Sequence, residues 1–120
     1  MALKTTPQRE PDQVLRYAHV ARRLGALVAV ILGLGMLFSL PTSMALHMGS
    51  GLLALLGIWL AAIRLAKQQR SSIVLWVAAL LAVGGVVAAL SGMGGMMHLV
   101  AMLLSLALAE LGVFLSTARP

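Results

Sequence analysis

The sequence predicts an all-α integral membrane protein whose four transmembrane helices form an up-down-up-down bundle. Three observations predict this class: 61% of the 120 residues are hydrophobic, only 10% are charged, and the mean hydropathy is +1.01. A soluble domain carries about a quarter of charged residues and buries only part of its surface when it is this small. The composition therefore excludes a soluble enzyme, a disordered chain and a secreted disulfide scaffold.

The apolar residues fall into four stretches, which we expect to span the membrane at about residues 20–40, 44–66, 72–90 and 96–117. Each is close to the roughly 20 residues that a helix needs to cross about 30 Å of hydrocarbon. Residues 1–19 are expected to be a polar, basic cytoplasmic tail and interfacial lead-in, and 118–120 a short C-terminal end. The links are short, with Pro41 in the first and glycines in the third. Short links place consecutive helices antiparallel.

The net charge of +6 reports orientation rather than nucleic-acid binding. No aromatic residues alternate with the basic ones, as a nucleic-acid platform needs. The basic residues lie in the tail, around the second link and near the C-terminus: Lys4, Arg9, Arg16, Arg22, Arg23, Arg64, Lys67, Arg70 and Arg119. Arg and Lys near helix ends mark the cytoplasmic side. We therefore expect the N and C termini in the cytoplasm and the chain in the plasma membrane, the inner membrane of a bacterium.

Several chemistries lack their residues. The chain has no cysteine, so thiolate metal sites and thiol redox chemistry have no ligand. Its only aspartate is in the tail, which leaves no Ser-His-Asp arrangement inside the membrane. We expect no enzyme, and at most a non-catalytic electron-transfer subunit.

Two histidines form the pattern most able to hold a cofactor. His47 and His98 each open a helix that runs from outside to inside, so they share one depth. Adjacent axes about 8–10 Å apart put diagonal helices roughly 11–14 Å apart. That spacing is too wide for the rings to touch, but it suits a flat macrocycle with one imidazole on each side. Ser50 and Gly51 beside His47, and Ala101 beside His98, leave room for a porphyrin edge. The cofactor expected is haem b.

This arrangement of two hairpins, each with a histidine opening its second helix, resembles haem-carrying four-helix membrane modules such as those of haem A synthases and b-type cytochromes. The resemblance lies in the layout of His47 and His98 alone, and no other residue is carried over. It implies electron transfer through a haem with two imidazole ligands.

The methionines around these histidines give a second interpretation. Met44, Met48, Met96 and Met97 lie within three residues of His47 or His98. Thioether and imidazole together form a soft ligand set that suits Cu(I), so a copper-handling membrane protein is an alternative. Methionine also fills gaps around large ligands, which fits a haem pocket without copper.

Two further titratable residues lie within or beside the apolar stretches. Glu110 is the only acid inside a span, where ionisable groups are costly. It is interpreted as a protonated structural carboxyl, a partner for Arg64, or a residue of proton-coupled transport. His19 is interpreted as an interfacial residue.

A third interpretation needs no cofactor at all. Small residues recur every four positions in the first span, at Gly25, Ala29 and Gly33, and such faces let membrane helices pack closely. The chain is then a structural or assembly subunit, surrounded by the lipid bilayer and other membrane subunits. The sequence leaves the haem, copper and cofactor-free interpretations open.

Overall fold

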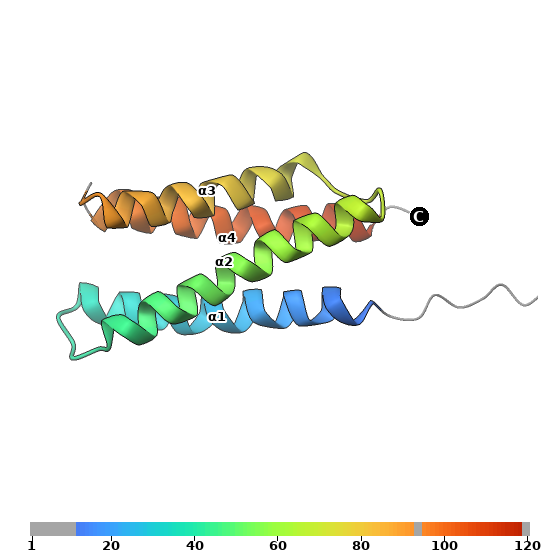
Figure 1. Ribbon diagram of the computed structural model, residues 1–120. Helices are drawn as coiled ribbons and strands as arrows, with labels where there is room; N and C mark the ends of the chain where they lie inside the picture. The colour runs from blue at the N-terminus through green and yellow to red at the C-terminus, as the bar shows by residue number, and fades with distance from the viewer. Residues whose placement is uncertain (1–11, 93–94, 119–120) are drawn as a thin grey trace, which may run out of the picture.

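The computed structural model describes residues 12–92 and 95–118, which form four α-helices (Figure 1). They are α1 (Gln13–Leu37), α2 (Met44–Lys67), α3 (Ile73–Leu90) and α4 (Gly95–Thr117). All four are long and apolar enough to cross a membrane. The predicted all-helical class with four candidate spans is thereby confirmed. Most of the tail predicted at 1–19, and residues 119–120 of the C-terminal end, lie outside the described residues.

Each of the first three helices begins after a polar side chain that accepts a hydrogen bond from a backbone N–H of the first turn. Asp12, Ser43 and Ser72 each precede a helix in extended backbone, and each side chain accepts a hydrogen bond from the N–H three residues later. Such caps satisfy one of the four N–H groups that a helix start leaves free. Because Asp12 starts α1, the amphipathic lead-in and the first span form one continuous helix.

The first helix ends at Leu37, three residues before the predicted end at 40. Ser39 adopts a left-handed backbone with φ of 57°, and the N–H of Leu40 donates to the carbonyl of Gly35 at 2.8 Å. This is the Schellman geometry, which satisfies the last carbonyls of a helix while turning the chain away. The second helix ends the same way, with Gln69 at φ 56°.

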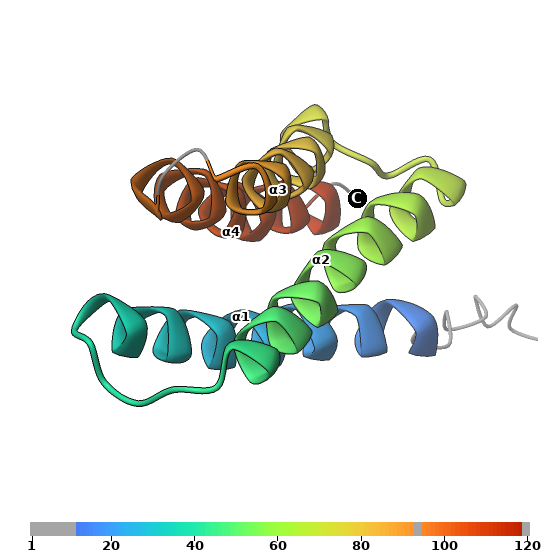
Figure 2. The ribbon, with the colours of Figure 1, turned by 60° about the vertical axis from the view of Figure 1, so that its left-hand side comes forward.

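The helices pair as two antiparallel hairpins, α1 with α2 and α3 with α4, while α2 crosses obliquely from the first hairpin toward the second (Figures 1 and 2). Glycine allows the close crossing in each hairpin. A Cβ on Gly57 would lie 2.6 Å from the backbone N of Arg22, and one on Gly112 would lie 2.6 Å from the backbone N of Leu75. Small residues at such contacts let the two backbones approach closely. This matters in lipid, where helices associate through close packing rather than through the hydrophobic effect.

The buried core lies at one end of the molecule, where α2 ends, α3 begins and α4 ends. Its buried members are Ile58, Ala62, Leu65, Leu75, Ala78, Ala79, Ala82, Ala109 and Val113. The other end, which contains the starts of α2 and α4, contributes none of these members. The hairpins are thus joined firmly at one end and diverge toward the other (Figure 1).

An ion pair closes the first hairpin at the core end. The Asp12 carboxylate accepts hydrogen bonds from Arg64 Nε at 2.7 Å and from Gln68 Nε2 at 2.5 Å. The hydrogen bond from Arg64 is the largest cause that holds the pKa of Asp12 below its ordinary value of 3.8. A lowered carboxylate pKa means that the native state favours the ionised form.

Acid should therefore weaken this hairpin. The contribution of Asp12 to stability is full above pH 3.8 and is lost as the pH falls through the lower pKa of the folded state. In detergent, Asp12→Asn should unfold at a lower temperature than the parent at pH 7, and this difference should be smaller at pH 3. Asparagine keeps the helix cap, so the difference between the two pH values isolates the charge. An equal loss at both pH values would contradict this account.

Candidate functional site

Each predicted histidine is fixed by a backbone carbonyl of its own hairpin. His47 Nδ1 lies 2.9 Å from the carbonyl oxygen of Ala29, and His98 Nδ1 lies 2.8 Å from that of Gly85. A carbonyl only accepts, so each Nδ1 carries the hydrogen and donates it. In the neutral ring, Nε2 is then left with a free lone pair. Gly33 makes room for the His47 ring, because a Cβ there would lie 3.1 Å from Cε1.

The two imidazoles meet between the hairpins. Their ring centroids are 6.2 Å apart and their planes are inclined at 83°. The expectation that the rings are too far apart to touch is wrong, since edge-to-face contacts extend to about 7 Å. That expectation used the distance between helix axes, whereas both side chains extend from their helices into the intervening space. His47 and His98 therefore come together from α2 and α4, as a shared site requires.

The separation of the two rings can be compared with that of two ligands on opposite sides of one metal. An imidazole nitrogen binds a metal at about 2.0–2.1 Å, and with each centroid about 1.1 Å further back two such rings are roughly 6.3 Å apart. The observed distance of 6.2 Å between the centroids is close to this value. Within residues 12–92 and 95–118, no group of three or more His, Cys, Asp or Glu side chains is placed to hold a metal.

The small residues predicted beside the histidines have distinct surroundings. Ser50 Oγ donates to the carbonyl of Leu46 at 2.7 Å, so its hydroxyl is used within α2. A Cβ on Gly51 would meet nothing within 4 Å, which leaves open space at this position. Ala101 packs against Gly85, the residue whose carbonyl holds His98.

The methionines of the copper alternative lie at the same end but on the outside. Met44, Met48, Met96 and Met97 are each between 54% and 68% exposed. Exposed thioethers on apolar helices suit contact with lipid chains. These methionines therefore do not enclose a metal together with the imidazoles. The histidine pair, by contrast, is half-buried.

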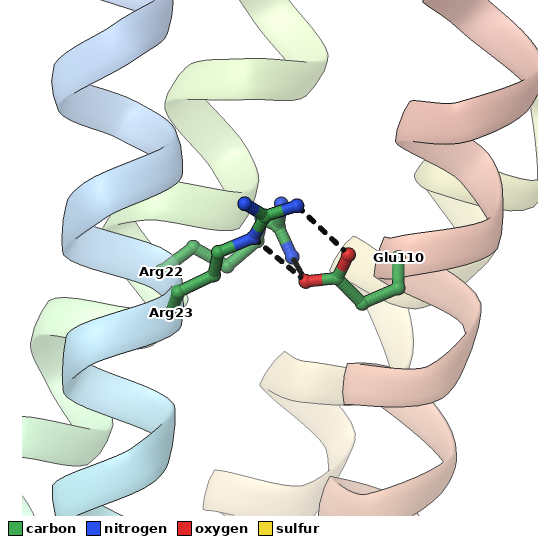
Figure 3. Close-up of polar contacts among 3 residues, drawn as sticks. All are labelled: Arg22, Arg23 and Glu110. Atoms are coloured by element: carbon green, nitrogen blue, oxygen red, sulfur yellow. Dashed lines mark hydrogen bonds and ion pairs between the residues drawn. The ribbon is translucent and has the colours of Figure 1, made fainter.

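A second polar site joins α1 to α4 (Figure 3). Arg22 Nη1 donates to Glu110 Oε1, while Arg23 donates from Nε and Nη2 to the two carboxylate oxygens at 3.2 and 3.3 Å. The prediction that Arg64 is the partner of Glu110 is wrong. Arg64 lies at the end of α2 beside the start of α1, so it pairs with Asp12 instead. Glu110 lies on the side of α4 that faces α1, where Arg22 and Arg23 reach it.

Arg22 belongs to this second site, although the sequence analysis used it only as a signal of topology. Its side chain is 2% exposed, and its Nε and Nη2 have no hydrogen-bond partner among the described residues. It is buried because Gly57 brings α2 against the backbone of Arg22 and Ala18. His19, expected at the interface, has a buried Nδ1 that likewise finds no partner in the described part of the chain. The sequence did contain a signal for this site, because Arg22 and Arg23 lie in the first apolar stretch and Glu110 in the fourth.

Two sites of different chemistry thus lie between the hairpins, one built from two imidazoles and the other from two guanidinium groups and a carboxylate. The imidazole pair is suited to metal ligation, and the arginines to binding an anion. Comparisons of the chain with protein-family models, with curated proteins and with solved structures find no match.

Proposed function

We propose that this chain is a small membrane carrier of haem b in electron transfer, with His47 and His98 as axial ligands. One observation carries the proposal. Both histidines donate Nδ1–H to a carbonyl, which leaves two Nε2 lone pairs on rings 6.2 Å apart. Ligating histidines almost always donate their other N–H in this way, because it fixes the tautomer and raises the basicity of the ligating nitrogen.

The residues of this chain would orient and tune the group. A haem with two imidazole ligands passes single electrons, and its potential depends on the axial ligands and on their hydrogen bonds. The carbonyls of Ala29 and Gly85 hold the two rings in fixed orientations. Gly33 makes room for the His47 ring, and Gly51, one turn further along α2, has open space beside it. The core cluster of the described residues has no member at this end, which favours a large apolar ligand there.

The proposed topology places this site near the outer face of the bacterial inner membrane. The positive charges around the second link and in the tail support cytoplasmic N and C termini. The four helices then cross up, down, up and down. We further propose that other membrane subunits supply and accept the electron.

Single cysteines test this orientation, since the chain has none of its own. In intact cells, Ser43→Cys in the first link should react with an impermeant thiol reagent, because this link is proposed to lie outside. Lys67→Cys, at the end of α2, should react only after the membrane is opened. The reverse pattern would overturn the proposed topology.

The spectrum of the purified protein tests the haem. The expected result is a sharp α band in the reduced-minus-oxidised difference spectrum, with one haem per chain. Copper retained without haem would instead support the alternative built on Met44, Met48, Met96, Met97 and the histidines. Protein that binds neither haem nor copper when each is supplied would support the cofactor-free subunit.

A further inference from the structure

A groove between α1 and α4 lies beside the charged cluster and is independent of the histidine pair. Its volume is about 300 Å³. One part of its lining is charged, and the remainder is apolar. The lining residues are Arg22, Arg23, Ala26, Leu27, Val30, Leu106 and Glu110. A groove with a polar head and an apolar body matches an amphipathic ligand.

The charged part carries an excess positive charge. Arg22 and Arg23 bring two guanidinium groups against the single carboxylate of Glu110. The Arg22 side chain is only 2% exposed, yet its Nε and Nη2 have no hydrogen-bond acceptor in the described structure. Buried donors without partners are costly, and a buried charge more so. The cluster is therefore short of one negative group that can accept hydrogen bonds.

We propose that this groove binds an acidic phospholipid, with its phosphate on Arg22 and Arg23. A phosphate diester carries one negative charge and several acceptor oxygens, which matches both deficits. Guanidinium and phosphate form paired hydrogen bonds, and basic pockets between membrane helices bind anionic headgroups. An acyl chain would lie along Ala26, Val30 and Leu106. The surrounding bilayer supplies such a ligand directly.

Glu110 competes with this ligand. Its carboxylate now accepts from the same guanidinium groups that would hold the phosphate. It is also half exposed, so it can move aside without crossing the core. Removing its charge should therefore strengthen lipid binding, whereas removing a guanidinium should weaken it. These opposite effects distinguish a specific site from general attraction to a basic surface.

Native mass spectrometry of the delipidated full chain in neutral detergent tests the proposal. Phosphatidylglycerol should bind once per chain and about tenfold more tightly than phosphatidylcholine with the same acyl chains, because both lipids carry the phosphate but the choline group adds a positive charge beside the arginines. Arg23→Gln should weaken phosphatidylglycerol binding about tenfold, as loss of one charge-assisted hydrogen bond allows, and Glu110→Gln should tighten it. Arg16→Gln, an exposed arginine on the same helix, should change it little.

Arg22→Gln should weaken binding further, and its thermal unfolding shows whether the variant is folded. Arg23 is 66% exposed, so Arg23→Gln keeps the test valid if the buried variant fails to fold. Equal binding of the two lipids, or weaker binding by Glu110→Gln, would overturn the proposal. So would displacement of the lipid by an equal concentration of inorganic phosphate, because the site would then recognise the free anion.

Discussion

Replacing His47 by alanine should abolish the bis-imidazole haem spectrum. One of the two Nε2 donors is then missing, and the iron keeps at most a single protein ligand. We expect the sharp α band to vanish and the haem-to-protein ratio to fall well below one after purification. Loss of an outer hydrogen-bond partner alone costs about 10–100-fold in metal affinity, so loss of a ligand should cost more. His98→Ala should behave identically, because the two rings play equivalent parts.

The matched control is His19→Ala, which removes the third histidine of the chain, near the start of α1. It should keep the full α band, since His19 belongs to the neighbourhood of the charged cluster. Circular dichroism shows whether each variant keeps its helices. If folded His47→Ala and His98→Ala both retain a full complement of haem with an unchanged spectrum, the assignment of the ligands is wrong.

The helices were predictable from sequence because each apolar stretch is long enough to cross a bilayer and the links between them are polar or glycine-rich. The end of α1 was not, since it depends on Ser39, which adopts a backbone conformation that non-glycine residues avoid. Propensity gives no warning of such a residue. Only the bond from Leu40 to Gly35 shows that the helix has closed there.

The site was predictable in part. The position of His47 and His98 at matching depths follows from their places in two antiparallel hairpins. Their bonds to Ala29 and Gly85 do not, because these depend on the register at which the helices of each hairpin cross. That register is set by close glycine contacts.

The ion pair of Glu110 with Arg22 depends on how the hairpins lie relative to each other. No periodicity within one helix encodes this arrangement. Arg64 was one of three interpretations of Glu110 that the sequence left open, and it is held by Asp12 instead.

Gly57→Ala should cause a large loss of stability in the first hairpin. Its Cβ would lie 2.6 Å from the N of Arg22 and 2.7 Å from the carbonyl oxygen of Ala18. Both are backbone atoms, which cannot rotate away, so α1 and α2 must separate. Overpacking of this kind costs about 1–3 kcal/mol, more than the roughly 1 kcal/mol that alanine gains over glycine in helix propensity. Unfolding in mixed micelles with increasing sodium dodecyl sulfate measures the change in free energy.

Gly49→Ala on the same helix is the matched control, because a Cβ there would meet nothing within 4 Å. It gains the same helix propensity without any clash, so its stability should rise by up to about 1 kcal/mol. The two substitutions are chemically identical and differ only in what lies beside the new methyl group. If the free energy of unfolding falls for Gly57→Ala and rises for Gly49→Ala, the difference comes from the close approach of α1 and α2 at Gly57. Should both variants be stabilised equally, the two helices do not approach at Gly57, and the burial of Arg22 loses its cause.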